Sequence, residues 1–168
     1  MTGSCPDEIR VRRIGAVDWA LWRELRLQAL EEAPYAFSSR VADWQGQGDT
    51  ETRWRGRLSD VPLNIVAEWQ DTAAGMASGT APDPHGSIEI ISMWVAPVAR
   101  GHGVGDALVN AAVEWAREQQ ASRLTLGVLE GNERAAAFYG RHGFIPVGTS
   151  AGPVTERRMA RDLFTGFR

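Results

Sequence analysis

The chain has 168 residues, 43% of them hydrophobic, which fits one compact domain over residues 1–168. Its 18 basic residues, all arginine, and 21 acidic residues give a formal net charge of -3, so we expect no broad basic field for nucleic acid or an anionic membrane. A single cysteine excludes an internal disulfide, and no apolar run reaches the roughly 20 residues of a membrane span. A cytoplasmic protein without a signal peptide is therefore expected.

The first sixty residues predict one strand and two helices. Residues 8–13 alternate apolar and polar side chains with the period of a half-buried strand. Asp18 can cap a helix over residues 18–32, which has apolar residues three or four apart. A second, mostly polar helix is expected over residues 49–58, with Pro62 closing it.

Beyond Pro62 the periodicity is that of strands. Residues 63–69 and 73–80 predict a hairpin that turns at Gln70 and Asp71. Residues 87–95, "SIEIISMWV", are rich in β-branched and large apolar side chains, and we interpret them as a central strand that is apolar on both faces.

The second half of the chain alternates helices and strands. Apolar residues recur at helical spacing over residues 103–120, followed by a strand at 122–129 and a short helix over 132–143. A last strand is expected at 156–163, after a glycine-rich turn. This order is typical of an α/β protein with a mixed sheet and helices on both faces, a three-layer αβα sandwich.

Three glycines alternate between the central strand and the long helix, in the segment "ARGHGVG". Gly101, Gly103 and Gly105 follow Arg100 directly. Small residues let ligand atoms approach the backbone, and the first-turn N–H groups of a helix attract anions. The loop therefore predicts a ligand that carries phosphate. A tight turn that allows close helix packing is the structural alternative.

Two common nucleotide-binding patterns do not fit this loop. A Walker motif needs Lys and then Ser or Thr after its last glycine, whereas Gly105 is followed by Asp106 and Ala107. The dinucleotide pattern GxGxxG fails because the position three after Gly103 is Asp106.

Two segments together resemble the GNAT superfamily of N-acetyltransferases. "VAPVARGHGVGDAL" is similar to the acyl-CoA signature of that family, and "NERAAAFYGRHGF" is similar to its second signature. The close resemblance covers residues 87–148. It implies a central, mostly antiparallel sheet that is splayed between two parallel strands, here 87–95 and 123–129.

The resemblance also implies how acetyl-CoA would be held. Backbone N–H groups from Arg100 to Gly105 would bind the pyrophosphate, and the backbones of Met93 and Val95 would pair with the pantetheine arm. Asp106, if it points to solvent, can cap the following helix. The expected coenzyme-binding residues are Met93, Trp94, Val95, Arg100, Gly101, His102, Gly103, Val104, Gly105, Asp106, Asn132, Ala135 and Tyr139.

Asn132 and Tyr139 are seven residues apart, about two helical turns, so both can face one ligand. The resemblance implies that Tyr139 is the general acid that protonates the coenzyme A sulfur. A phenol with a pKa near 10 is protonated at neutral pH and can donate. Core packing beside Phe138 and Phe144 is the alternative role for this ring.

Glu89 lies on the central strand, four residues before Met93. The resemblance implies a carboxylate here that deprotonates the amine, directly or through water. Burying a carboxylate in an apolar strand is costly unless it is paired or protonated, which suggests a cleft. A solvated strand edge or an arginine partner would explain Glu89 equally well, so its role as a base stays open.

The acceptor site is expected near the segment that joins the first two helices. Its Tyr35, Phe37, Asp43 and Trp44 could select an amine by shape and charge, although core packing explains the aromatic residues as well.

The sequence therefore predicts an acetyl-CoA-dependent N-acetyltransferase. His85, His102 and His142 lack metal-ligand spacing, and no nucleophile signature is present, so direct transfer in a ternary complex without a metal is expected. The expected acceptor is a small primary amine, the alternatives being a protein N-terminus or lysine. A non-catalytic acyl-CoA sensor is the hypothesis from another class, and a homodimer is left open.

Overall fold

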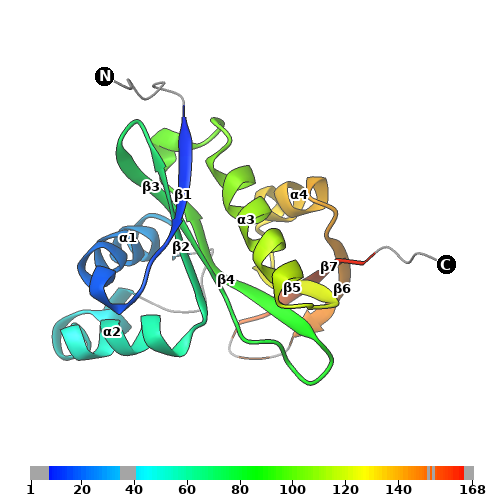
Figure 1. Ribbon diagram of the computed structural model, residues 1–168, viewed down its shortest axis with the longest axis horizontal. Helices are drawn as coiled ribbons and strands as arrows, with labels where there is room; N and C mark the ends of the chain where they lie inside the picture. Colours follow the sequence, from blue (N-terminus) through cyan, green and yellow to red (C-terminus); the bar gives the residue numbers. More distant parts are fainter. Residues whose placement is uncertain (1–7, 35–40, 151, 153, 165–168) are drawn as a thin grey trace.

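The computed structural model of the protein describes residues 8–34, 41–150, 152 and 154–164. In these residues seven strands form one sheet in the order β1-β2-β3-β4-β5-β7-β6, with α1 and α2 on one face and α3 and α4 on the other (Figure 1). The predicted mixed sheet with helices on both faces is confirmed. The elements are β1 (Ile9–Arg13), α1 (Trp19–Glu32), α2 (Glu51–Asp60), β2 (Leu63–Trp69), β3 (Thr72–Gly79), β4 (Ser87–Val95), α3 (Val104–Glu118), β5 (Arg123–Leu129), α4 (Glu133–Arg141), β6 (Ile145–Ser150) and β7 (Glu156–Asp162).

The two parallel strands at the centre of the sheet diverge. β4 and β5 pair only from Ser87 opposite Arg123 to Glu89 opposite Thr125. The other neighbouring strands pair antiparallel, and beyond Glu89 β4 stays with β3 while β5 stays with β7. The splayed and mostly antiparallel sheet that the resemblance implied is therefore present.

A bulge in β4 moves its side chains from one core to the other. Ser92 has a φ of 55°, and the register with β3 shifts beside it. Ile88 and Ile90 belong to the cluster on the α3 face, whereas Trp94 belongs to the cluster on the α1 face. An extra residue in a strand reverses the facing of everything after it. β4 thus has apolar side chains against the clusters on both faces, as predicted, although several of them are only partly covered.

Each face of the sheet has its own hydrophobic cluster. Trp22 and Trp54 are fully buried under α1 and α2. Leu108 and Leu124 are fully buried on the opposite face, where α3 packs. The cluster under α3 includes residues of both β4 and β5, so it spans the two splayed strands.

Two helix starts differ from the sequence prediction. Asp18 precedes α1, but its carboxylate accepts a hydrogen bond from Gly15 N at 3.0 Å and does not cap the helix with its side chain. α2 begins two residues later than expected, because Thr50 is its cap and accepts from Arg53 N at 3.2 Å.

The strand β6 is absent from the predicted elements. Its Pro146 and Gly148 are unfavourable inside a sheet, and most of its residues are exposed. The strand exists because it lies at the sheet edge and pairs with β7 alone.

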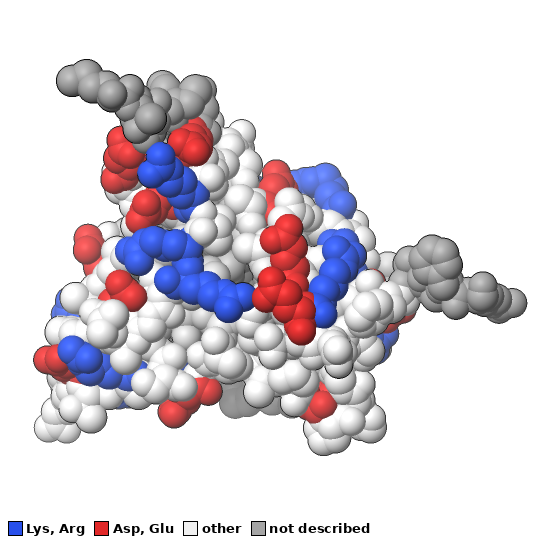
Figure 2. All heavy atoms as spheres, in the orientation of Figure 1, with Lys and Arg blue, Asp and Glu red and all other residues white. Residues whose placement is uncertain are grey.

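Acidic and basic side chains alternate over the face of the molecule that Figure 2 shows, without a broad patch of either sign on that face. Among the described residues, no helix combines the length and the apolar character that crossing a membrane requires.

Candidate active site

The loop between β4 and α3 depends on two glycines for its backbone shape. Gly101 and Gly103 have φ values of 82° and 89°, in the left-handed region. A Cβ at Gly101 would meet nothing within 4 Å, and one at Gly103 would touch only Ile9, at 3.5 Å. Conformation, not lack of space, therefore requires glycine at both positions.

Gly105 serves a different purpose. Its backbone is ordinary helix, but a Cβ there would lie 3.1 Å from the ring of Phe138 and 3.6 Å from Val95. This glycine lets α4 and β4 approach α3 closely. The packing alternative from the sequence thus applies to Gly105, while Gly101 and Gly103 shape the loop.

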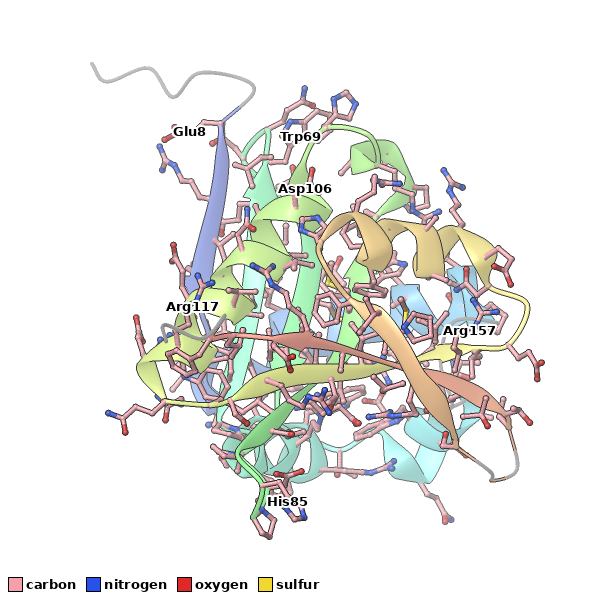
Figure 3. The ribbon with its side chains drawn as sticks, turned by 90° about the vertical axis from the view of Figure 1, so that its right-hand side faces the viewer. Glu8, Trp69, His85, Asp106, Arg117 and Arg157 are labelled. Atoms are coloured by element: carbon pink, nitrogen blue, oxygen red, sulfur yellow. The ribbon has the colours of Figure 1, made fainter. Side chains whose placement is uncertain are left out.

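The loop presents a row of backbone N–H groups. The first hydrogen bond into α3 runs from Ala107 N to Gly103 O at 3.0 Å, so the N–H groups of the first turn have no helical acceptor. Within the described chain, the backbone N–H groups of residues 101–103 also donate no hydrogen bond to another backbone group. His102 stacks on Trp69, with ring centroids 4.4 Å apart. Trp69 and Asp106 lie at one end of the molecule, opposite His85 (Figure 3). The arrangement suits an anion such as a phosphate.

Asp106 does not cap α3, whose N-cap is Gly103. The carboxylate is exposed as expected, but it lies 2.6 Å from His142 Nε2 at the end of α4. The pair links the first turn of α3 to α4 and gives the acidic side chain a partner beside the N–H groups of the loop.

The side chain of Arg100 braces the loop. Its Nη1 and Nη2 donate to the two oxygens of Glu32 at 3.0 and 2.7 Å, and its Nε donates to Val95 O at 3.1 Å. Trp94 Nε1 donates to the same carboxylate at 3.0 Å. The bond from Arg100, and then that from Trp94, lowers the pKa of Glu32. Arg100 N also donates to Pro97 O at 3.2 Å, so Arg100 supports the loop and its backbone N–H is not open to a ligand. Glu32 is a supporting residue that the sequence did not reveal.

The backbone of β4 is open toward the gap between the splayed strands. Ala96 N donates to Ala74 O at 2.8 Å, so the backbone groups of Ala96 and Trp94 face β3. Because backbone directions alternate along a strand, those of Met93 and Val95 face away from β3 into the gap. The structure thus brings the backbones of Met93 and Val95 to the gap. The backbone of Trp94 faces β3, and its side chain is buried against α1.

A cavity of about 340 Å³ lies where the gap meets α1 and α2. Small-molecule sites usually occupy about 300–1,000 Å³. The lining residues are Trp22, Arg26, Trp44, Trp54, Arg57, Glu89, Ile90, Ile91, Ser92, Met93, Leu126, Gly127, Tyr139, Glu156 and Arg158. Both candidate catalytic residues from the sequence, Glu89 and Tyr139, are among them.

Tyr139 reaches the cavity from α4. Its ring packs edge-on against Phe138 and Phe144, with centroids 5.2 and 5.7 Å away, so it has the packing role as well. Burial raises the pKa of Tyr139 and keeps the phenol protonated. Asn132 is not among the lining residues, and its Oδ1 caps α4 by accepting from Ala135 N at 3.2 Å.

Glu89 has an arginine partner inside the cavity. Arg158 Nη2 donates to Glu89 Oε2 at 2.5 Å, and Arg158 Nη1 lies 3.7 Å from Glu156 Oε2. Gly127 lies opposite Arg158 in the sheet, and a Cβ there would collide with both Glu156 and Arg158. The cleft and the arginine partner, which the sequence left as alternatives, thus occur together.

The residues expected at the acceptor site are only partly placed by the structure. Trp44 lines the cavity and packs against Trp54 at a ring-centroid distance of 4.5 Å and a tilt of 32°, whereas Asp43 is not among the lining residues. Tyr35 and Phe37 lie outside the described residues.

Three arginines that line the cavity were not predicted: Arg26, Arg57 and Arg158. The signal available for them was weak. Arg26 is a charged residue on the buried face of α1, and Arg57 is one of several arginines in the mostly polar helix α2. Arg158 differs only in lying opposite a glycine, Gly127, in the sheet.

No group of three or more His, Cys, Asp or Glu side chains that could hold a metal ion is found in the part of the chain that the structure describes.

Known proteins resemble both the sequence and the fold. The model of the acetyltransferase (GNAT) family matches residues 19–144. The uncharacterized N-acetyltransferase YobR of Bacillus subtilis is 30% identical over 86 residues, 51% of this chain and 35% of YobR. The peptidyl-lysine N-acetyltransferase YjaB of Escherichia coli is 34% identical over 98 residues, 57% of this chain and 58% of YjaB. The matched region therefore covers less than two thirds of either relative.

The structure of yncA from Salmonella typhimurium with its cofactor acetyl-CoA superimposes with a TM-score of 0.73, at 17% identity, over 96% of this chain and 97% of that one. This likeness shows the shared fold. The family model spans well over half of the sequence and includes the glycine loop, the splayed strands and Tyr139. This chain belongs to the GNAT family of acetyltransferases.

Proposed function

We propose that the protein is an N-acetyltransferase that moves the acetyl group of acetyl-CoA to the primary amine of a small molecule, by direct transfer in a ternary complex. The observation that carries the proposal is the continuity of the site. The gap between β4 and β5 opens into a cavity of about 340 Å³ that Tyr139 and Glu89 both line.

The chain's own groups fit coenzyme A. The N–H groups of residues 101–106 would hold the pyrophosphate, because the backbone at Gly101 and Gly103 leaves open space beside it. The backbone of Met93 and the N–H of Val95 would pair with the pantetheine amides, as an added strand does, while Val95 O accepts from Arg100 Nε. Acetyl-CoA is the cofactor named in the yncA structure, which has the same fold.

Two side chains would handle the protons of the transfer. The bound thioester supplies the acetyl group, and the amine must lose a proton as the thiolate leaves. Tyr139 is protonated and can donate its hydroxyl proton to the departing sulfur. Glu89 keeps Oε1 for an amine or a bridging water, since Arg158 binds Oε2.

The size and lining of the cavity support a small acceptor. Three tryptophans and several charged side chains surround a volume at the lower end of the range for small-molecule sites. Acetylation of lysine in proteins is the second candidate, because YjaB is named a peptidyl-lysine N-acetyltransferase. A non-catalytic sensor of acyl-CoA would need only the gap that holds the coenzyme, and it would not need the adjoining cavity.

The test is thiol release from acetyl-CoA with a panel of amines, amino acids and lysine peptides, using Cys5→Ser protein to remove the protein's own thiol. Release that depends on a small amine supports the proposal, and release with peptides alone supports the second candidate. Saturable coenzyme binding without release for any acceptor would favour the sensor.

A further inference from the structure

Two arginines lie on the acceptor side of the cavity, Arg26 buried and Arg57 half-buried. By the acceptor side we mean Trp22 and Arg26 of α1 with Trp54 and Arg57 of α2, all of which line the cavity. Burial, and then repulsion from Arg57, lowers the pKa of Arg26 to about 10. Burial alone lowers the pKa of Arg57 to about 10. Both side chains are still charged at neutral pH, because a pKa of about 10 lies well above 7.

Arg57 is held by neutral groups only. Its Nη1 donates to Asn64 Oδ1 at 3.0 Å, and its Nη2 donates to Ser78 Oγ at 3.1 Å and Ser92 Oγ at 3.2 Å. A guanidinium has five N–H donors. Within the described residues, the Nε donor and one Nη1 donor of Arg57 therefore have no acceptor, and no carboxylate neutralises the charge.

The support of Arg57 is rigid. Asn64 is buried and uses all of its polar atoms: it donates to Leu58 O and Val61 O, and it accepts from Ser78 at 2.7 Å as well as from Arg57. A fixed guanidinium loses little freedom when it binds a planar anion at its remaining donors.

The charges in the cavity are divided between two walls. On the helical wall, Arg57 has a positive charge that no carboxylate among the described residues neutralises. On the strand wall Glu89 and Glu156 share the single cation of Arg158, which leaves that wall with one net negative charge. A ligand with an ammonium group and an anion a few atoms apart would match both walls and be oriented by them.

We infer that the acceptor is a free amino acid or a similar amine that carries a carboxylate, with Arg57 binding the carboxylate and the amine lying toward Glu89. This inference rests on the proposed function and names the substrate class of the same site. The open N–H donors of Arg57 can each bind a carboxylate oxygen, and hydrogen bonds between charged groups are stronger than those between neutral groups. The tryptophans that line the cavity add a preference for an apolar side chain.

The first test uses the wild-type protein, so it does not depend on a variant. Phenylalanine, tryptophan, leucine and methionine are compared with their carboxamides and decarboxylated amines in the thiol-release assay. We expect kcat/KM to be at least about tenfold higher for one or more of the acids, because a site built for a charged group rejects analogues that lack it. Equal kcat/KM for every acid and its matched analogues would overturn the inference.

The second test changes the binding residue. Arg57→Gln should lower kcat/KM for the acid about 10–100-fold and remove most of the preference over the carboxamide. Arg55→Gln is the matched control, because Arg55 lies on the same helix and pairs at the surface with Glu51 at 2.8 Å. An unchanged preference in Arg57→Gln protein that still binds coenzyme A would contradict the assignment of Arg57.

Binding measurements separate this inference from the reaction itself. Calorimetry compares the N-acetyl derivatives of the four amino acids with the N-acetyl carboxamides, in the presence of coenzyme A. Tighter binding of an acid, lost in Arg57→Gln, supports the carboxylate site even if no amine releases thiol. Equal binding of acid and amide refutes the site even if acetyltransferase activity is found.

Discussion

The coenzyme side and the acceptor side of the cavity are made from different parts of the polypeptide. The coenzyme side consists of Met93, Val95 and the loop from Arg100 to Asp106, and it presents mainly backbone groups. The acceptor side presents tryptophan rings and guanidinium groups from α1 and α2. Mutations on the first side should therefore act through backbone shape, whereas mutations on the second should act through the chemistry of single side chains.

The largest effect is expected where the two sides meet, at Tyr139. Tyr139→Phe removes the proton donor and keeps the ring packed between Phe138 and Phe144. We expect kcat to fall about 10²–10⁴-fold, the usual contribution of general acid catalysis, with coenzyme affinity unchanged. Steady-state kinetics and calorimetry with coenzyme A measure the two quantities. A kcat at the wild-type level would leave Tyr139 with its packing role alone.

The pH profile gives an independent check on Tyr139. Because burial raises the pKa of the phenol above its ordinary value of about 10, the group stays protonated throughout the neutral and mildly alkaline range. The rate should therefore show no alkaline loss from this residue below about pH 10. An alkaline limb near pH 8 that disappears in Tyr139→Phe would contradict this assignment.

The second effect concerns the backbone of the coenzyme side. Gly103→Val places a branched residue at a φ of 89°, which costs about 1–3 kcal/mol or displaces the loop. We expect coenzyme affinity to fall up to about 100-fold, while acceptor selectivity is kept at saturating acetyl-CoA. Calorimetry on a variant with an intact circular dichroism spectrum tests this. Wild-type affinity in such a variant would mean that the loop does not bind the pyrophosphate.

The backbone shape of the glycine loop could be predicted from the sequence for a physical reason. A site made of backbone needs glycines at fixed positions, and Gly101 and Gly103 both adopt the left-handed conformation that favours glycine. The same logic predicted the hairpin at Gln70 and Asp71, which have φ values of 52° and 58°. Local conformational requirements of this kind leave a local pattern in the sequence.

The acceptor side left no such pattern. Arg26 and Arg57 belong to different helices, and only their packing on one face of the sheet brings both to the cavity. Arg158 reaches Glu89 across 69 residues of sequence. The brace from Glu32 to Arg100 spans 68 residues. Side-chain pairs at such separations depend on the complete fold, so sequence reasoning from one chain could not identify them.

A third and smaller effect should show that the brace supports the coenzyme side. Glu32→Gln weakens the two bonds to Arg100, so coenzyme affinity should fall a few-fold, about as expected for one partly exposed charged pair. Calorimetry with coenzyme A measures it, with Glu51→Gln in α2 as the control, since that exposed pair lies away from the loop. A loss of equal size in both variants would contradict a specific role of the brace.

The same pair predicts a pH dependence of stability. The folded pKa of Glu32 is lowered, so its stabilisation is present above the unfolded pKa of about 4.3 and is lost as the pH falls through the folded value. Urea unfolding at neutral pH should therefore show wild type more stable than Glu32→Gln, with the difference shrinking below about pH 4. A difference that grew on acidification would have the wrong sign.

The smallest effect contrasts two glycines directly. Gly56 lies inside α2 with ordinary helical backbone, and a Cβ there would meet nothing within 4 Å. Gly56→Ala should therefore stabilise the protein by about 0.5–1 kcal/mol, by restricting the unfolded chain, and leave coenzyme affinity unchanged. Gly101→Ala should do the opposite, although the space beside it is equally open, because its φ is 82°. Urea unfolding of both variants tests the contrast. If both alanines stabilised the protein, the loop would not hold Gly101 in the left-handed conformation, and the coenzyme side would no longer depend on backbone shape.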